Sequence, residues 1–180
     1  MKIVKIFGLI LLLVILYFPV KKFIRKTYYD FMYKKEKENT IEWNKNFNLE
    51  WSDFNYSKTK NSFTRVGIAN RYEFNQDLTI DYNSVTLFYP KDSYVNDTTD
   101  LHKLQLNQAR FDLCEIYRRK LEKKIITLNF NEFPESRKDS VDINTVLYYE
   151  LFEQEWEKIM NLTENEKLNR FKLIKNQLND

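Results

Sequence analysis

Residues 101–126 read LHKLQLNQARFDLCEIYRRKLEKKII, and the spacing of their apolar side chains predicts one long helix. When the residues are placed at 100° steps with Leu113 at zero, Leu106, Ala109, Ile116 and Tyr117 gather near zero and the other apolar side chains continue the arc to about 160°. The arc contains Leu106, Ala109, Phe111, Leu113, Cys114, Ile116, Tyr117, Leu121 and Ile125. Two polar residues, Asn107 and Arg110, fall inside it. Because burying an unpaired guanidinium costs several kcal/mol, these side chains either have partners in the core or mark a site.

Three segments before this helix are rich in β-branched and aromatic residues and are predicted strands. They cover residues 49–56, 62–74 and 78–90, and polar clusters separate them. In the third segment two alternating patterns meet at Asn83 and Ser84, which indicates a bulge, a tight turn or a division into two strands. We expect a small antiparallel sheet of three to four strands.

Polar loops are predicted on both sides of the central helix. In the first loop, residues 91–100, Thr98, Thr99 and Asp100 are candidates to cap the helix. The second loop, residues 129–144, leads to a long helix predicted over 145–178, with a break near 161–164 where Thr163 can cap a restart. Because the strands come first and the helices follow, we predict an α+β fold in which the sheet packs against two long helices.

Most apolar residues of the final helix are expected to be core residues, because they recur at helical spacing. In its first half they are Leu147, Leu151, Phe152, Trp156, Ile159 and Met160. In its second half they are Leu168, Phe171, Leu173, Ile174 and Leu178. The terminal stretch, residues 167–180, has an alternative role, in which its apolar side chains offer a face to a partner.

The N-terminal 26 residues carry the most apolar stretch of the chain. Residues 6–20 read IFGLILLLVILYFPV, fifteen positions without a charge, somewhat fewer than the about 20 that a spanning helix needs. A Lys/Arg cluster follows instead of the small residues of a cleavage site, so we predict an uncleaved, single-pass transmembrane anchor at 1–26. A cleaved signal peptide and a short buried helix are the alternatives. Residues 27–47 are then a juxtamembrane helix or stalk, and residues 48–180 a single domain.

The net charge of +3 is concentrated near the predicted anchor. Residues 1–38 hold nine Lys or Arg and three Asp or Glu, which leaves 20 basic and 23 acidic residues in the remainder. A folded part with a small negative charge is not typical of nucleic-acid binding, so no nucleic-acid partner is expected. Tyr17, Phe18, Tyr28 and Tyr29 suit a membrane interface, and the cations of residues 21–26 suit anionic headgroups.

The central helix also carries a family resemblance. Residues 106–121, LNQARFDLCEIYRRKL, are similar to the H-E-x-x-H-F-D-I helix of a bacterial domain family of unknown function described as secreted zinc-dependent proteases. The shared residues are Gln108, Phe111, Asp112, Glu115, Arg119, Lys120 and Leu121, with Leu113 in place of the isoleucine. The W-x-D-F strand of that family is matched by Trp51, Asp53 and Phe54, and its Ser-aromatic pair by Ser93 and Tyr94. The resemblance covers residues 48–160. We expect the W-x-D-F residues to be core and strand-edge residues rather than ligand contacts.

The chain departs from this family at the metal site. The two zinc-binding histidines would fall at Leu106 and Arg110, and the catalytic glutamate at Asn107. In H-E-x-x-H, two imidazoles one turn apart chelate zinc while the glutamate activates the bound water. Leucine has no lone pair to donate, and arginine is permanently cationic and repels a metal ion. We therefore expect a degenerate member that is not an enzyme and holds no metal or cofactor.

No other residues form a marked catalytic set. His102 is the only histidine, and with Cys114 it supplies at most two ligands, whereas a catalytic zinc site needs three. We expect His102 to be an exposed residue at the helix start and Cys114 to be a core thiol. A single histidine also limits Ser-His and Cys-His chemistry, and the two glycines exclude the usual Gly-rich phosphate loops. The alternative is a hydrolase with an atypical metal or carboxylate site, since 26 acidic residues leave a carboxylate pair open.

Two roles are open for Arg110. As a functional group, it would capture an acidic peptide or a chain terminus in the former cleft. As a structural group, it would form an internal ion pair with a carboxylate of the strand region, such as Asp77 or Asp81, and we favour this role.

Taken together, these patterns predict a membrane-anchored, non-catalytic domain that binds a protein or peptide. A purely structural envelope component is a further alternative. The resemblance implies export and an extracytoplasmic domain, which we favour, whereas the cations that follow the apolar run favour a cytoplasmic domain.

Overall fold

The computed structural model describes residues 17, 20, 21, 23, 24, 26–75, 77, 79–128 and 136–179. The chain divides into two compact units, Met1–Glu36 and Lys37–Asp180. The described residues before position 38 are helical. None of the helices formed by the described residues is both long enough and apolar enough to cross a membrane. The predicted anchor, residues 1–26, falls largely on positions outside that description.

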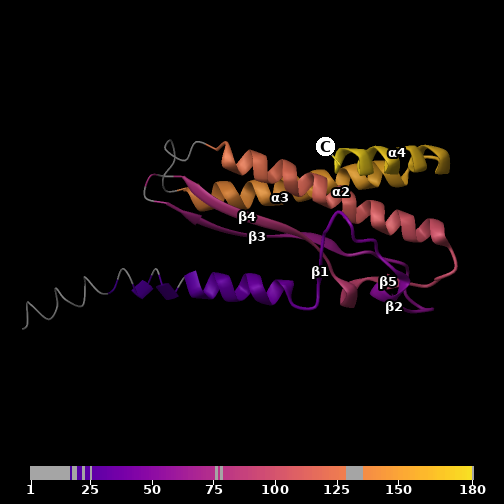
Figure 1. Cartoon of the computed structure of the whole chain (residues 1–180), viewed down its shortest axis with the longest axis horizontal. Helices are drawn as coiled ribbons and strands as arrows, with labels where there is room; N and C mark the ends of the chain where they lie inside the picture. The colour runs from indigo at the N-terminus through magenta and orange to yellow at the C-terminus, as the bar shows by residue number, and fades with distance from the viewer. Residues whose placement is uncertain are drawn as a thin grey trace, which may run out of the picture. The chain divides into compact units, whose positions relative to one another are not determined.

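The second unit is α+β and contains a three-stranded antiparallel sheet in the order β1-β4-β3 (Figure 1). The strands are β1 (Ile41–Glu42), β3 (Val66–Phe74) and β4 (Ile80–Phe88). β3 and β4 pair along their full length, from Val66 opposite Phe88 to Phe74 opposite Ile80. The predicted α+β class and small antiparallel sheet are therefore confirmed.

β4 runs through Asn83 and Ser84 as one regular strand, so the predicted bulge, turn or division is wrong. Asn83 lies opposite Arg71 and Ser84 opposite Asn70, with no extra residue on either strand. Ser84 is only 8% exposed, and its Oγ accepts a hydrogen bond from Nη1 of Arg118 at 3.1 Å. A polar residue fits this core-facing position because the neighbouring helix supplies its partner.

The predicted first strand, residues 49–56, is not part of the main sheet. It forms the 3-10 helix η1 (Trp51–Asp53) and the short strand β2 (Asn55–Tyr56), which pairs in parallel with β5 (Tyr94–Val95) after the 3-10 helix η2 (Pro90–Asp92). Its place in the sheet is taken by β1, in which Ile41 pairs with Phe88. β1 lies in the predicted stalk, so the compact unit begins at Lys37 rather than at residue 48.

Three helices follow the strands: α2 (Leu101–Ile126), α3 (Arg137–Met160) and α4 (Glu164–Gln177). Oδ1 of Asp100 caps α2 by accepting a hydrogen bond from the backbone N–H of His102 at 2.9 Å. The predicted break is confirmed, because α4 restarts where the N–H of Thr163 donates to Oε2 of Glu166 at 2.9 Å. α3 begins at Arg137, earlier than the predicted start at 145, because the polar run 137–144 places Val141 in the core.

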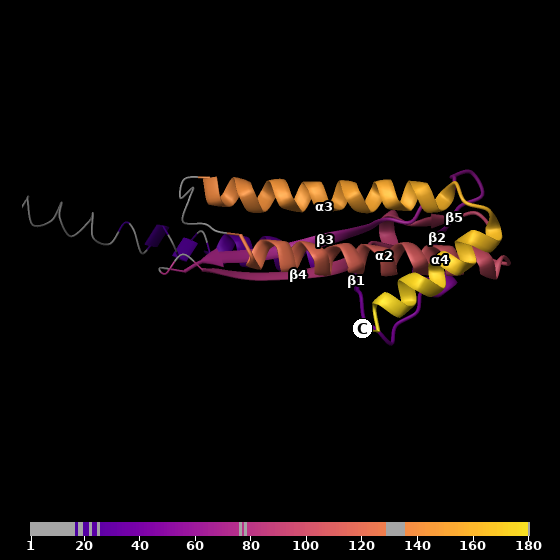
Figure 2. The same ribbon diagram turned by 90° about the horizontal axis from the view of Figure 1, so that it is seen from above.

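The three helices lie on one face of the sheet, and Figure 2 shows α3 running beside α2 in the opposite direction. α2 is central, since it contacts β3 and β4 as well as α3 and α4. Hydrogen bonds tie α3 to β3: the Tyr149 hydroxyl donates to the carbonyl of Val66 at 3.1 Å, and the Tyr72 hydroxyl donates to Oδ1 of Asp142 at 3.0 Å. Because α2 packs against both the sheet and two helices, Glu115, which lies outside the predicted arc, is also buried.

Candidate functional site

The residues at the family's metal positions lie in the first half of α2 and make internal contacts. Leu106 is half-buried. Oδ1 of Asn107 accepts a hydrogen bond from the Thr64 hydroxyl at 2.8 Å. Arg110 is 8% exposed. The helix phasing that placed Arg110 in the interior is therefore confirmed.

Arg110 forms the predicted internal ion pair, but with a different partner. Its Nη2 lies 2.6 Å from Oε1 and 2.9 Å from Oε2 of Glu153 on α3, and its Nε donates to the carbonyl of Thr64 at 3.1 Å. The guanidinium also lies 5.0 Å from the ring centre of Phe152 and 5.3 Å from that of Trp156. The partner carboxylate comes from α3 and not from the strand region, so the predicted partners Asp77 and Asp81 were wrong.

Asp77 and Asp81 lie away from this guanidinium. Oδ1 of Asp77 accepts hydrogen bonds from the backbone N–H and the hydroxyl of Thr79, at 3.1 Å and 2.6 Å, which lower the pKa of the Asp77 carboxyl. Asp81 is an exposed residue of β4 that pairs with Glu73 across the hairpin. The Asp77 carboxylate is therefore hydrogen-bonded within its own turn, and the Asp81 side chain is exposed to solvent.

Gln108 and Asp112 fasten the segment after β1 to α2. Oδ1 of Asp112 accepts hydrogen bonds from Nε1 of Trp43 at 2.9 Å and from Nε2 of Gln108 at 2.8 Å. Oε1 of Gln108 accepts a further hydrogen bond from the backbone N–H of Leu49 at 2.8 Å. Burial raises the pKa of Asp112, and the hydrogen bonds from Trp43 and Gln108 oppose the shift without cancelling it. These two motif residues therefore have a structural role in holding residues 43–49.

Replacing Asp112 with Asn is expected to leave the free energy of unfolding at pH 7 unchanged or to raise it by up to about 1 kcal/mol. The amide oxygen can accept both hydrogen bonds, and the variant avoids the cost of burying a charge. Because the folded pKa is raised, ionisation of the native carboxyl reduces stability as the pH rises through that pKa, so the advantage of Asn should vanish in acid. Urea unfolding across the pH range measures this difference.

The matched control for this prediction is Asp112→Leu. It removes the charge as well as both hydrogen bonds, and it is expected to cost about 1–3 kcal/mol because Nε1 of Trp43 loses its acceptor. Equal losses for the Asn and Leu variants would show that the carboxylate charge, and not the pair of hydrogen bonds, stabilises this segment.

Glu115, which like Gln108 and Asp112 belongs to the motif on α2, is the centre of a buried polar network. The residue is 4% exposed. Its carboxylate accepts hydrogen bonds from the Thr86 hydroxyl at 2.8 Å, from Nε and Nη2 of Arg118 at 2.8 Å each, and from Nε of Arg119 at 2.9 Å. Nη1 of Arg118 continues to Glu122 at 2.6 Å. Burial alone would raise the pKa of Glu115, but these donors outweigh it and hold the pKa below its ordinary value.

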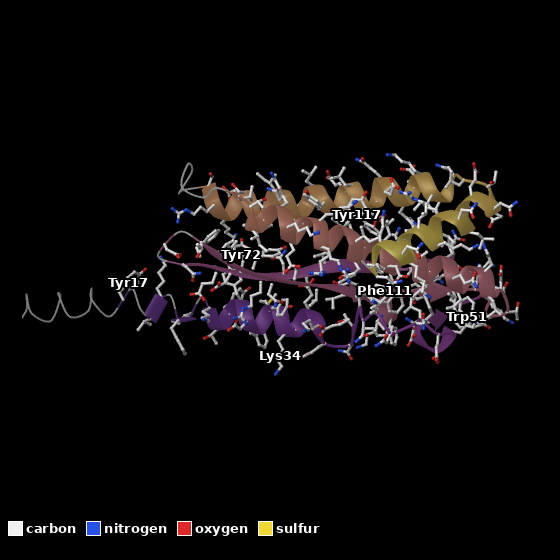
Figure 3. All side chains as sticks on the ribbon, turned by 45° about the horizontal axis from the view of Figure 1, so that its top comes forward. Tyr17, Lys34, Trp51, Tyr72, Phe111 and Tyr117 are labelled. Atoms are coloured by element: carbon white, nitrogen blue, oxygen red, sulfur yellow. The ribbon has the colours of Figure 1, made fainter. Side chains whose placement is uncertain are left out.

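Of the W-x-D-F residues, Phe54 is in the core as expected and Trp51 packs partly buried against it, whereas Trp51 and Asp53 belong to the 3-10 helix η1 and not to a strand edge. Phe54 is 8% exposed and continues an aromatic row, with ring centres 6.0 Å from Trp51 and 5.0 Å from Phe88, which in turn lies 6.0 Å from Phe111. Trp51 and Phe111 lie toward the same end of the domain (Figure 3). Asp53 instead caps η1, because its Oδ2 accepts a hydrogen bond from the N–H of Glu50 at 2.8 Å.

His102 and Cys114 do not meet. They are separated by about 18 Å along α2, at a rise of 1.5 Å per residue. Cys114 is fully buried, and burial raises the pKa of its thiol. Nε2 of His102 lies 3.3 Å from Oε2 of Glu164, without the geometry of a hydrogen bond. Over the described part of the chain, no three His, Cys, Asp or Glu residues are grouped so that they could hold a metal ion.

An exposed apolar surface on α3 was missed by the sequence-based prediction. It consists of Ile143, Val146, Leu147 and Leu151, which are 65%, 57%, 44% and 38% exposed, and we call it the α3 outer face. Leu147, Leu151 and Met160, which is 39% exposed, are among the residues of the final helix of which most were predicted to be core, and these three are not. A helical wheel distinguishes the two sides, because the buried Val141, Phe152 and Ile159 fall within about 20° of one another and the α3 outer face lies opposite.

The second half of the predicted final helix, which is α4, also has both buried and exposed apolar side chains. Ile174 and Leu178 are buried at 2% and 6% exposure, and Phe171 packs against the core, as predicted. Leu168 and Leu173 are 37% and 51% exposed and are not core residues. α4 thus uses one side for packing and leaves two isolated aliphatic side chains in solvent.

Comparisons with protein-family models, curated proteins and solved structures find no match to this chain. The resemblance to the zinc-protease-like family therefore stays a prediction that rests on the motif residues alone. Gln108, Arg110, Asp112 and Glu115 of α2 are bonded to neighbouring segments, and they hold residues 43–49, β4 and α3 against the central helix.

Proposed function

We propose that this chain is a membrane-anchored, non-catalytic domain that binds a protein partner, and that it is a degenerate relative of the zinc-protease-like family. The apolar run at residues 6–20 would be its single-pass anchor, and the domain would lie on the extracytoplasmic side, as the resemblance implies. The observation that carries the binding role is the α3 outer face.

The non-catalytic part of the proposal is supported by the contacts at the family's metal positions. Leu106 has no donor atom, and Asn107 is hydrogen-bonded to Thr64. The guanidinium of Arg110 is neutralised by Glu153. A zinc ion would meet one aliphatic group, one amide and one cation there, and none of these is a ligand that zinc prefers.

The binding part is supported by the grouping of aliphatic side chains on α3. Exposed hydrophobic residues that are scattered singly need no explanation, but contiguous ones mark contact surfaces. Val146 and Leu147 follow Ile143 by three and four residues, and Leu151 follows Leu147 by four, so the side chains lie on adjoining turns of one side of the helix. Burying a Val or Leu side chain fully is worth about 1.5–3 kcal/mol, so this face can supply substantial binding energy.

The charges around the α3 outer face define the chemistry of the partner. Asp139, Glu150 and Glu157 lie on the same side of α3, are exposed, and form no ion pair with any described residue, and they outnumber the exposed Lys158 on that side. Two copies of this face would bring carboxylates together, which disfavours self-association through it. The complementary occupant is an amphipathic helix that carries aliphatic side chains flanked by Lys or Arg.

The proposal predicts that the full chain binds a synthetic helix of Leu and Lys in heptad arrangement. The protein is held in phosphatidylcholine nanodiscs. The double substitution Val146→Ser and Leu147→Ser should weaken binding at least about tenfold, because the variant lacks two aliphatic side chains that the peptide would bury. Fluorescence titration of a labelled peptide gives the affinities.

Two controls make the result specific. Leu101 and Ile126 are 68% and 60% exposed at the ends of α2, so replacing both with Ser removes comparable apolar surface and should not change binding. A peptide of Leu and Glu should bind far more weakly than the Leu and Lys peptide. Equal affinity of the α3 variant and the unmodified chain would refute the proposed surface, and stoichiometric zinc together with peptide hydrolysis would refute the non-catalytic role.

A further inference from the structure

The helix that ends at residue 37 carries an exposed apolar line on one side. Tyr17, Val20, Ile24, Tyr28 and Phe31 are spaced three or four residues apart, so they align along the helix. They are 57%, 52%, 61%, 58% and 60% exposed, and we call them the aromatic stripe. Five large apolar side chains in one exposed row exceed the scattered exposure expected of a soluble surface.

The opposite side of the same helix has a different character. Asp30 and Tyr33 lie there, and both are less exposed than the residues of the stripe. Phe23 and Met32, which are 71% and 42% exposed, flank the stripe and widen it. The most exposed apolar side chains of this helix are therefore concentrated on and beside the stripe.

Lysines accompany the stripe. Lys34 and Lys35 are exposed at its C-terminal end, and Lys34 extends away from the helix (Figure 3). Nζ of Lys21 lies 5.6 Å from the ring centre of Tyr17. Aromatic rings with lysines around them are typical of the headgroup layer, where the rings sit at the apolar boundary and the ammonium groups meet lipid phosphates.

The position of the stripe in the chain favours lipid over protein as its occupant. The stripe shares Tyr17 and Val20 with the apolar run of residues 6–20 and carries apolar contact past the Lys/Arg cluster of residues 21–26, by about 16 Å from Val20 to Phe31 at the rise of an α-helix. The run has fifteen residues, fewer than the about 20 that a bilayer core requires. An interfacial extension supplies the apolar contact that the short run lacks.

We infer that the aromatic stripe lies in the headgroup layer of an anionic membrane, with Lys34 and Lys35 on the lipid phosphates, so that residues 20–35 run along the membrane surface. This inference rests on the proposed membrane tether. The anchor is then a composite of a short apolar run and a surface-bound helix. Each lysine near an anionic surface is worth about a fivefold gain in affinity.

The test uses the full chain reconstituted in vesicles of phosphatidylcholine, with or without phosphatidylglycerol. Phe31→Cys probes the stripe, and Lys45→Cys at an exposed loop position is the reference. Cys114 is fully buried and can stay in place. The rate of labelling by a membrane-impermeant maleimide is measured at both positions, and their ratio cancels the fraction of chains that face inward.

In vesicles with phosphatidylglycerol, the position-31 thiol is expected to react at least about ten times more slowly than the reference. Substituting Lys34→Glu and Lys35→Glu should restore most of its reactivity. The matched control, Lys123→Glu and Lys124→Glu at the exposed end of α2, changes the charge equally and should leave the protection intact.

The outcomes separate this inference from the membrane tether. Fast labelling at position 31 in chains that float with the vesicles would overturn the inference while the tether stands. Chains that do not float would overturn both. Protection that is independent of phosphatidylglycerol and of Lys34 and Lys35 would overturn the assignment to anionic lipid, and protection seen only in native membranes would point to a protein instead.

Discussion

Replacing Glu115 with Leu is expected to lower the free energy of unfolding by about 3 kcal/mol, near the lower end of the range for breaking a buried charge network. The carboxylate is 4% exposed and accepts hydrogen bonds from Thr86, Arg118 and Arg119. Its loss leaves Arg118, whose side chain is 14% exposed, short of its main partner. Glu122 and Ser84 still accept from Arg118 and limit the damage. Urea unfolding monitored by circular dichroism measures the change.

Glu122→Leu is the matched control for this prediction. Glu122 contacts the same guanidinium from the next turn of α2, but its side chain is 34% exposed. A partly exposed pair contributes little, so the control should cost less than about 1 kcal/mol. If both substitutions cost the same, the position of Glu115 at the centre of the network would have no special importance.

The same carboxylate gives the protein a defined acid sensitivity. The folded pKa of Glu115 lies below its ordinary value of 4.5, because the arginine and threonine donors outweigh the effect of burial. Its contribution is therefore present above pH 4.5 and is lost as the pH falls through the folded pKa. Glu115→Gln should remove this part of the acid limb of the stability curve, whereas Asp112, with its raised pKa, has the opposite dependence.

The helical part of the fold follows from local sequence signals. The apolar spacing of residues 101–126 matches α2, Asp100 caps it as predicted, and Thr163 marks the start of α4. These features are readable because a helix and its caps depend on residues three or four positions apart. The predicted loop, residues 129–144, is too long, since α3 begins at Arg137. Polar residues on the solvent side of a helix resemble a loop in composition.

Which segments join the main sheet depends on contacts between residues far apart in the sequence, and local patterns do not reveal these contacts. β1 has only two residues, too few for an alternating pattern, and it is a strand because Ile41 meets Phe88 and the backbone N–H of Trp43 donates to the carbonyl of Thr86. Trp43 is then fixed by Asp112, far along the chain. Long-range pairings of this kind determine the domain boundary, which is why the predicted domain began too late.

The sequence predicted that Arg110 is buried and paired, but it did not predict which residue is the partner. That Arg110 is interior and paired follows from the helix phase and the cost of an unpaired charge. The identity of Glu153 as partner does not follow, because it requires knowing that α3 packs beside the first half of α2. The α3 outer face was missed for a related reason: apolar spacing alone was taken as burial, although Leu147 and Leu151 point at least about 100° away from the buried Phe152 and are exposed.

The second large effect is expected at the Arg110–Glu153 pair. Glu153→Leu should cost about 2–3 kcal/mol, because it leaves a guanidinium with the Thr64 carbonyl as its remaining oxygen partner. The side chain of Arg110 is 10% exposed and that of Glu153 is 38% exposed. Arg110→Met should cost less, about 1–2 kcal/mol, since water can reach the carboxylate that is left behind. Thermal and urea unfolding of both variants give the two values.

The double variant Arg110→Met with Glu153→Leu decides between the two roles of this arginine. If the pair is a closed structural unit, the double variant should be more stable than the sum of the single losses implies, by about 1–2 kcal/mol of coupling. Lys138 and Asp142, an exposed pair on α3, should show almost no coupling. If Glu153→Leu instead costs nothing, the guanidinium does not depend on Glu153, and capture of an acidic chain terminus becomes the better account of its place in the former cleft.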